Sequence, residues 1–426
     1  MLHLTSQFIQ SFRAHLTKSA FAMLLLALIA TPAMQAQTFS VIHVFSGGGD
    51  GYQPYAGLTI DQAGNLYGTT TEYVGGTAFK MRQVNGNWVL YPLSSIDLIP
   101  YSRVVFGPGG ALYGTSLEGG TSEFCEFGCG SVYALTPQQT VCKTFSCPWV
   151  QTYLHSFTDG DDGGNPNFVD PVFDAEGNLY GTAAIGGTAG IGVVYEMTHS
   201  ADGSWNETVL HNFTGPDGAY PYSGLIFDHA GNLYGTTGYG GANDMGTVFE
   251  LSPNGPGWTL TTLYDFQGTT DGSSPSATLM FDPAGNLYGA TVTGGVNGGG
   301  TVFRLSPSGG SWNFSLLYSL TGQITDKSYP GVYNALVMDA AGNLYGAAYH
   351  DGGNGNGAIF KLTPASGTWT YTSLHDFTGG ADGADPLGGV IFDTHGNLFG
   401  TTVLGGMTGG ENCYSQGCGV VWEITP

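Results

Sequence analysis

The chain has 426 residues, with 72 glycines and only 10% charged residues, and its 32 acidic against nine basic side chains give a formal net charge of −23. A surface this acidic repels phosphate backbones and anionic lipids, so the composition argues against nucleic acid as a partner. After the first 36 residues, no segment is apolar enough to span a membrane.

The first 36 residues have the organisation of a secretory signal peptide. Arg13 and Lys18 precede the apolar run of residues 20–30, which is shorter than the roughly 20 apolar residues that a membrane span requires. We predict cleavage after Ala36 and secretion of residues 37–426 into the periplasm or the medium. The residue directly after the predicted cleavage position is Gln37 and not a cysteine, so we expect no lipid anchor.

The rest of the chain contains seven copies of a phrase that reads Asp-x-x-Gly-Asn-Leu-Tyr-Gly-Thr where it is best preserved. Three of the six intervals between copies are 54 residues, from 181 to 235, from 235 to 289 and from 346 to 400. A fixed period in this range indicates a solenoid, a propeller or another repeat array. The final glycines of the phrase are Gly68, Gly114, Gly181, Gly235, Gly289, Gly346 and Gly400.

One repeat contains four short runs with strand character. In the best-preserved copy these are residues 223–228, 232–237, 246–252 and 258–266, separated by glycine, proline and asparagine. Short strands and turn residues at this spacing, with no competing helical period, are typical of an all-β fold. Four antiparallel strands in each of seven repeats predict a single seven-bladed β-propeller over residues 37–426.

The two ends of this region match different parts of the repeat. Residues 38–45 are similar to the fourth strand of a repeat, such as residues 205–213, whereas residues 419–426 are similar to the third strand. The last repeat therefore lacks a fourth strand, and we predict that the N-terminal strand completes the last blade and closes the ring. Closure removes an exposed sheet edge, which would otherwise favour aggregation.

The Asp-x-x-Gly-Asn element predicts a hairpin between the first two strands of a blade. Its aspartate can accept N–H bonds within the turn, and its glycine supplies a positive φ. The alternative is a calcium loop, but one carboxylate is few for an ion that takes about six to eight oxygen ligands. The aspartates of this element are Asp61, Asp174, Asp228, Asp282, Asp339 and Asp393.

A second element, Asp-Gly-x-x-Pro, links the outer strand of one blade to the inner strand of the next. We expect its aspartates on one rim of the disc, where they could form an acidic mouth to the central channel and bind a cation or a sugar. The alternative is that they only cap tight turns. We predict no cofactor. Calcium is the one ion that the aspartates of this rim could bind. The candidate ligand-binding residues are Asp50, Asp162, Asp217, Asp271, Asp326 and Asp382.

Six cysteines fall in three local pairs, which is typical of disulfides in an exported protein. Six cysteines allow 15 connectivities, so the local pairing is a hypothesis from spacing. The alternative is a metal site, but no matching histidine cluster accompanies the pairs. The expected pairs are Cys125 with Cys129, Cys142 with Cys147, and Cys413 with Cys418.

Two further regularities concern the contacts between blades. A tryptophan opens the fourth strand in six repeats, and we expect it to pack between neighbouring blades, the alternative being an exposed sugar-stacking surface. Third-strand charges lie side by side around a closed ring, and we expect them to form ion pairs between blades. These predicted pairs are Glu250 with Arg304, and Glu423 with Lys80.

The series Gly-Asn-Leu-Tyr-Gly-Thr-Thr, then Gly-Gly, then Gly-Thr-Val-Phe-Glu-Leu-Ser-Pro resembles the GloVer tandem repeat of secreted bacterial proteins, over about residues 38–426. The resemblance implies export, a propeller-like body and often a C-terminal surface anchor. It implies no activity and no catalytic residue. Because the sequence stops at Pro426, inside the last predicted blade, we expect release rather than surface attachment. The hairpin element is more loosely similar to NHL-like and lyase-type seven-bladed propellers.

Motifs for a serine nucleophile, a phosphate-binding loop or a zinc site are absent from the sequence, and its ten histidines are dispersed. We therefore predict a secreted, non-enzymatic, monomeric propeller that binds an unidentified glycan, protein or cation, or acts as an extracellular scaffold. The alternative is a carbohydrate-active hydrolase or lyase with its site at the channel mouth. An exposed, unpaired carboxylate cluster at the mouth would favour the enzyme, and a filled or symmetric mouth would favour binding.

Overall fold

The computed structural model describes residues 37–72, 75–96, 99–122, 125–138, 149–322, 331–406, 413 and 416–426. The folded body is one compact unit, Phe39–Thr425, and a second unit consists of residues 1–38 and Pro426. The predicted signal peptide, residues 1–36, lies outside the described residues. Within them, no helix is long and apolar enough to cross a membrane.

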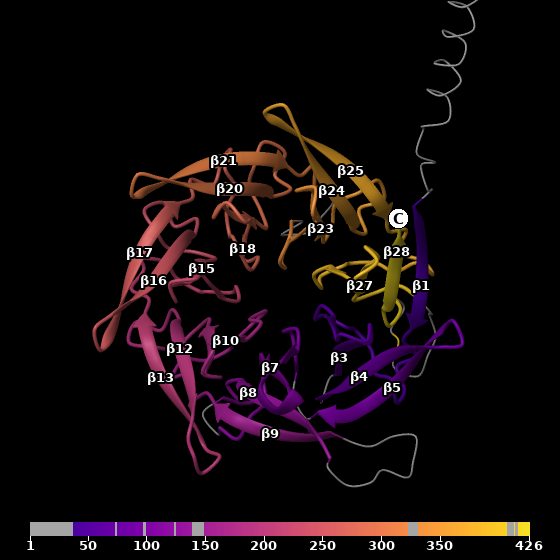
Figure 1. The fold of residues 1–426 in the computed structure, drawn as a ribbon, viewed down its shortest axis with the longest axis horizontal. Coiled ribbons are helices and arrows are strands. Elements are labelled where there is room, and N and C mark those ends of the chain that lie inside the picture. The colour runs from indigo at the N-terminus through magenta and orange to yellow at the C-terminus, as the bar shows by residue number, and fades with distance from the viewer. Residues whose placement is uncertain are drawn as a thin grey trace, which may run out of the picture. The chain divides into compact units, whose positions relative to one another are not determined.

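The folded body is a ring of seven blades, each a sheet of four antiparallel strands (Figure 1). This confirms the predicted seven-bladed β-propeller. In every blade the two-residue first strand lies innermost and the fourth strand outermost.

Blades 1 to 3 contain β2 (Thr59–Ile60), β3 (Leu66–Glu72), β4 (Gly75–Val84) and β5 (Asn87–Ile96); β6 (Val105–Phe106), β7 (Leu112–Ser116), β8 (Ser131–Pro137) and β9 (Trp149–Ser156); and β10 (Val172–Phe173), β11 (Leu179–Ala183), β12 (Val193–His199) and β13 (Trp205–Asn212). Blades 4 and 5 contain β14 (Ile226–Phe227), β15 (Leu233–Thr237), β16 (Thr247–Asn254) and β17 (Gly257–Asp265); and β18 (Met280–Phe281), β19 (Leu287–Ala290), β20 (Thr301–Ser308) and β21 (Ser311–Ser319). Blades 6 and 7 contain β22 (Val337–Met338), β23 (Leu344–Ala348), β24 (Ala358–Ala365) and β25 (Thr368–Asp376); and β26 (Ile391–Phe392), β27 (Leu398–Thr402), β28 (Val420–Thr425) and β1 (Thr38–Val44). One 3-10 turn, η1 (Pro108–Gly110), precedes β7.

The N-terminal strand closes the ring, as predicted. β1 is the outer neighbour of β28 in the sheet of blade 7, and the Phe45 N–H donates to the Gly419 carbonyl at 3.2 Å. The Phe45 side chain is fully buried, and its ring centroid lies 5.5 Å from that of Phe79 in blade 1. The closing strand therefore supplies both the missing sheet edge and part of the core between the last and first blades.

Each Asp-x-x-Gly-Asn element forms the predicted hairpin between the first and second strands. In blade 4, Asp228 Oδ1 accepts the N–H groups of Ala230 and Asn232 at 2.8 and 2.9 Å. Its Oδ2 accepts the Asn232 side-chain amide at 2.8 Å and the Tyr234 hydroxyl at 3.2 Å. The aspartate thus acts as a turn cap, and Gly231 at φ 86° supplies the left-handed residue of the turn.

The glycine inside the second strand is required by close packing. A Cβ at Gly235 would lie 2.7 Å from the Phe249 ring and 2.9 Å from the Leu225 side chain. Both neighbours are buried in the core, so neither has room to move aside. This explains why the phrase has glycine between tyrosine and threonine in the middle of a buried strand.

A repeated aromatic stack joins neighbouring blades. At the seam between blades 4 and 5, the Tyr234 ring lies 5.1 Å from Phe281 and 6.3 Å from Trp312, between centroids. The tyrosine comes from the second strand of one blade, and its partners come from the first and fourth strands of the next. The prediction that the tryptophans pack between blades is confirmed. The other contacts of this kind are Tyr67–Trp149, Tyr113–Trp205, Tyr180–Trp258, Tyr288–Trp369 and Phe399–Trp88.

The predicted ion pairs between blades are wrong. Lys80 Nζ lies 4.0 Å from Asp61 Oδ2 in its own blade, whereas Glu423 Oε2 accepts the Trp88 indole N–H at 3.2 Å. The register directs each third-strand side chain toward the second-strand aromatic of its own blade, so the charges of adjacent blades do not face each other. Among the ion pairs of the described residues, neither expected pair is present, that is Glu250 with Arg304 or Glu423 with Lys80.

Candidate binding site at the channel mouth

The aspartates of the Asp-Gly-x-x-Pro linkers are held by the outermost strands. Asp217 Oδ2 contacts the His211 Nε2 at 2.8 Å, and Asp217 Oδ1 accepts the Thr214 N–H at 2.8 Å. Asp271 accepts the Tyr264 hydroxyl and the Gln267 N–H, both at 2.9 Å. The same histidine contact recurs in the pairs His43–Asp50, His155–Asp162 and His375–Asp382.

These contacts place the carboxylates beside the outer strands and not at the centre of the ring. Burial by itself would raise the pKa of Asp50, Asp162, Asp217 and Asp382, but hydrogen bonds from the histidine and from a serine or threonine lower it below its usual value. Asp326 lies outside the described residues. Ligand binding by the six aspartates stays a prediction, as does calcium binding. Within the described residues, no group of three or more His, Cys, Asp or Glu could hold a metal ion.

The residue before the linker proline has an unusual backbone. Non-glycine residues hold a left-handed φ at this position in five linkers, a conformation that costs about 1–3 kcal/mol each. A glycine would adopt the same turn without this cost, so the side chains at this position are of interest for function. They are Gln53 (φ 53°), Asn165 (φ 49°), Tyr220 (φ 54°), Ser274 (φ 53°) and Asp385 (φ 58°).

The loop between the second and third strands of the preceding blade holds this residue in place. The Asn165 N–H donates to the Cys129 carbonyl at 2.8 Å, and the Gln53 N–H donates to the Cys418 carbonyl at 2.8 Å. Equivalent bonds without cysteine involve Tyr220 with Ile191, Ser274 with Met245 and Asp385 with Asn356. The left-handed linker residues therefore have one common anchor.

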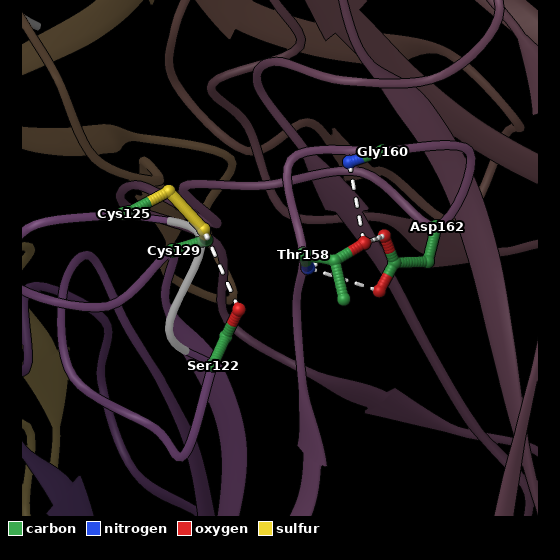
Figure 2. Close-up of a disulfide and its surroundings, with 6 residues drawn as sticks. All are labelled: Ser122, Cys125, Cys129, Thr158, Gly160 and Asp162. Carbon is green, nitrogen blue, oxygen red and sulfur yellow. Dashed lines mark hydrogen bonds between the residues drawn. A yellow bond between two sulfur atoms is a disulfide. The ribbon is translucent and has the colours of Figure 1, made fainter.

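Two disulfides brace these anchoring loops. Cys125 bonds to Cys129, with their Cα atoms 5.3 Å apart, and Cys413 bonds to Cys418. Figure 2 shows the first of them close to the linker on which Thr158 and Asp162 are hydrogen-bonded to each other. The predicted local pairing is therefore present for these four cysteines. The third expected pair, Cys142 with Cys147, lies outside the described residues.

Seven side chains gather at the mouth of the ring, one from each linker, and we call them the mouth ring. Each stands four residues before the innermost strand of its blade. Tyr101 lies 4.5 Å from Tyr55 and 5.6 Å from Phe168, and Phe168 lies 5.9 Å from Tyr333, between centroids. Phe168 and Tyr333 belong to blades 3 and 6, which are not neighbours, so these side chains converge across the axis. The mouth ring is Tyr55, Tyr101, Phe168, Tyr222, Ser276, Tyr333 and Leu387.

A pocket of about 260 Å³ opens within the mouth ring over blades 3 to 6. It exists because Ser276, from blade 5, is small where five of the other six members are aromatic. Tyr220 supports the wall from behind, 6.3 Å from Tyr222 and 5.7 Å from Tyr239 between centroids. The pocket is lined by Asn167, Phe168, Tyr222, Tyr239, Ser274, Ser276, Val292 and Tyr333.

Two buried carboxylates near the mouth, Asp170 and Asp385, have charged or ionisable partners. Asp170 Oδ2 lies 3.0 Å from the Arg103 guanidinium, and its Oδ1 accepts the Arg103 N–H at 2.8 Å. Asp385, buried to 4% exposure, lies 3.4 Å from His350 Nε2. The mouth ring contributes no carboxylate, and burial raises the pKa of its Tyr101 to about 12, so that this hydroxyl stays protonated.

The sequence matches the Gloeobacter/Verrucomicrobia repeat over residues 121–333, which is half of the chain. The chain belongs to this repeat family. None of the curated proteins compared with it matches. The family assignment agrees with the resemblance seen in the repeats, and it assigns no ligand and no reaction.

Solved structures similar to this member of the repeat family include a candidate 6-phosphogluconolactonase from Bacteroides uniformis, with 15% identity, 86% of this chain and 89% of that chain covered, and a TM-score of 0.46. A protein of unknown function from Dyadobacter fermentans has 11% identity, with 80% and 98% covered and a TM-score of 0.44. A luciferin-regenerating enzyme has 13% identity, with 92% and 95% covered and a TM-score of 0.42. At these identities the likeness concerns the fold alone.

The sequence analysis singled out the aspartate four residues before the linker proline, and its binding role stays a prediction. The side chains that converge on the axis are instead those around and after the proline. A signal was present, since Tyr55, Tyr101 and Tyr222 each follow a linker proline directly. The pattern is hidden in the other four linkers, because Ser276 and Leu387 follow the proline directly but are not aromatic, and Phe168 and Tyr333 stand two and three residues after it.

Proposed function

We propose that this protein is a non-enzymatic, carbohydrate-binding propeller that takes one neutral sugar ring into the pocket of the mouth ring. The observation that carries this proposal is the pocket itself, where four aromatic side chains surround small polar ones and none of the described lining residues is charged. Aromatic faces stack on the apolar face of a sugar, and hydroxyl and amide groups can bond its hydroxyls.

The size and charge of the site support a neutral monosaccharide unit. A volume of about 260 Å³ is below the roughly 300–1,000 Å³ typical of pockets for drug-sized ligands. Asn167, Ser274 and Ser276 offer both donors and acceptors, as sugar hydroxyls require. The net charge of −23 disfavours anionic ligands.

The alternative is a glycoside hydrolase or lyase, and the described geometry supports it less. Glycoside hydrolysis needs two carboxyl groups roughly 5–10 Å apart across a cleft. The lining of the mouth pocket has no carboxylate, and Asp170 and Asp385 nearby are engaged by Arg103 and His350. A polysaccharide-degradation screen run beside the binding assay keeps this alternative open to test.

The substitution Ser276→Tyr tests the proposal. It introduces the residue found at this mouth-ring position in four other blades, so the fold should accept it while the pocket fills. We expect wild-type protein to select neutral glycans on an array and to bind them in calorimetry, and Ser276→Tyr to lose at least tenfold in affinity. The control is Val296→Tyr, which adds the same side chain at a 72% exposed position in blade 5.

Equal binding by Ser276→Tyr and wild type, with equal melting temperatures, would show that the pocket is not the sugar site. Turnover of a polysaccharide by the wild type would replace the proposal with the enzymatic alternative.

We also propose that the protein is exported with residues 1–36 as its signal peptide. The two disulfides of the described residues support an oxidising destination. Expression of the full chain in a secreting bacterium, followed by N-terminal sequencing, should yield a protein that begins at Gln37. Retention of Met1 on the folded protein would contradict this.

A further inference from the structure

A second and larger cavity lies on the opposite face of the ring, at the seam between blades 7 and 1. We call it the seam groove. Its volume is about 600 Å³, and it is lined mainly by the first-to-second-strand hairpins of both blades, with Trp88 as one wall. The hairpins and the mouth linkers stand at opposite ends of the strands, so the seam groove is separate from the mouth pocket.

The groove exists because the tyrosine–phenylalanine pair found at five of the other six seams is absent here; at the seam of blades 5 and 6, Met338 replaces the phenylalanine but the tyrosine is kept. At the seam of blades 4 and 5, Tyr234 and Phe281 fill the space between hairpins. The equivalent residues at the seam of blades 7 and 1 are Phe399 and Ile60, so both a hydroxyl and an aromatic ring are missing. Phe399 contacts Trp88 at 5.6 Å between centroids, which leaves the region above Ile60 open.

The missing hydroxyl changes the hydrogen bonding of two carboxylates. In blade 3, the Tyr180 hydroxyl lies 3.1 Å from Asp174 Oδ2 and 2.7 Å from Glu196 Oε1, so that its single proton is available to either carboxylate. Asp393 and Glu423 occupy the same positions in blade 7, but Phe399 has no hydroxyl to donate.

Asp393 keeps the other bonds of its turn. Its Oδ1 accepts two backbone N–H groups, and its Oδ2 accepts the Asn397 amide at 2.8 Å. His395 Nδ1 lies 3.5 Å from Oδ2, on a side chain that is 82% exposed. In blades 1, 3, 4, 5 and 6 the corresponding oxygen accepts a tyrosine hydroxyl. Asp393 Oδ2 therefore lacks the tyrosine donor that the same position has in those blades, and among the ion pairs of the described residues only the exposed His395 imidazole stands beside it.

The surroundings favour a positively charged donor. Asp61 forms the other side of the groove, and Trp88 presents an aromatic side chain whose N–H is held by Glu423. No lysine or arginine lines the groove among the described residues, and Lys80 lies behind Asp61 at 4.0 Å. The carboxylates of Asp61 and Asp393 attract a cation by charge, and the Trp88 ring attracts it by cation–π interaction.

We propose that the seam groove binds a primary organic ammonium ion, with an N–H group donating to Asp393 and its stem against Trp88. The ammonium then does in blade 7 what the tyrosine hydroxyl does in blade 3. This site is independent of the sugar pocket at the mouth.

Two substitutions to residues used at the other seams test the proposal. Phe399→Tyr restores the hydroxyl, and Ile60→Phe fills the groove. The probes are n-butylammonium chloride and, as a cation that cannot donate a hydrogen bond, tetramethylammonium chloride at equal ionic strength. The readout is the NMR shift of the Trp88 indole N–H, assigned with Trp88→Phe.

We expect n-butylammonium to shift the Trp88 resonance in a saturable way and tetramethylammonium to bind more weakly. Each substitution should reduce the affinity for n-butylammonium at least tenfold, whereas Ser276→Tyr at the mouth should leave it unchanged. The proposal is overturned if n-butylammonium causes no saturable shift, or if neither Phe399→Tyr nor Ile60→Phe weakens its binding. Binding of the two cations with equal affinity would also overturn it, because the donor role would then be absent.

Discussion

At the scale of single residues, the repeated aspartates are mostly structural. The hairpin aspartates accept up to four hydrogen bonds within one turn, as Asp228 does. The linker aspartates are bonded to a histidine or tyrosine of the outermost strand, as Asp217 and Asp271 are. A carboxylate with this many donors has little capacity left for a ligand, which is why Asp393, with one donor fewer, is of interest.

Glu207, on the outermost strand of blade 3, gives the clearest pH-dependent prediction. Burial raises its pKa from 4.5 to about 7, with His155 opposing the shift and Asp162 adding to it. Its Oε1 is buried and accepts no hydrogen bond among the described residues. The pKa of Glu207 is higher in the folded than in the unfolded protein. Its contribution to the free energy of unfolding is therefore fully present below pH 4.5 and is lost as the pH rises through about 7.

Glu207→Gln should therefore stabilise the protein at pH 8 and make little difference at pH 4.5. We expect a gain of about 1 kcal/mol, reduced from the full linkage value because the side chain is partly exposed to solvent. Urea unfolding midpoints at the two pH values measure it, with Glu176→Gln, on an exposed hairpin of the same blade, as the control. A gain of the same size at both pH values would contradict the linkage argument.

At the scale of elements, the first strand is the one whose role depends most on tertiary structure. β1 forms the outer edge of blade 7 although it is about 380 residues away from β28 in sequence, and Phe45 just after it is fully buried. No other blade depends on a contact between the chain ends.

A protein of residues 47–426 should consequently aggregate or melt well below one of residues 37–426. Its β28 would be an exposed edge, and the cavity left by Phe45 would weaken the packing between blades 7 and 1. The point variant Phe45→Ala separates the two effects, because it keeps the strand and should cost about 3–5 kcal/mol of unfolding free energy. Light scattering and thermal melts measure both, and a soluble monomer of residues 47–426 with an unchanged melting temperature would contradict the role of β1.

At the scale of the whole molecule, both cavities arise where the repeat is interrupted. Ser276 breaks a mouth ring in which five of seven members are aromatic, and Phe399 with Ile60 replaces the tyrosine–phenylalanine pair found at five of the other six seams. An array of equal blades packs equally at every seam, so a departure from the shared residue leaves a local volume. The two cavities lie at opposite ends of the strands, so the proposed sites can be tested independently of each other.

The amino-acid sequence by itself determined the number of blades, the hairpin caps, the local disulfides of the described residues and the closing strand. These features depend either on residues that are close together in the chain or on the alignment of one repeat with another. Both can be seen in a periodic sequence. The interpretation failed where side chains from several blades meet: the ion pairs between blades did not form, because the strand register turned Glu250 and Arg304 toward tyrosines of their own sheets.

Only the tertiary structure decided which side chains share a site. Phe168 and Tyr333 are 165 residues apart by number and meet across the axis of the ring, and Asp61 and Asp393 face one groove because the ring closes. A sequence shows that Ser276 and Phe399 depart from their repeats, but not that one departure opens a pocket at the mouth and the other a groove at a seam. Those outcomes depend on packing volumes, which are set by neighbours from different blades.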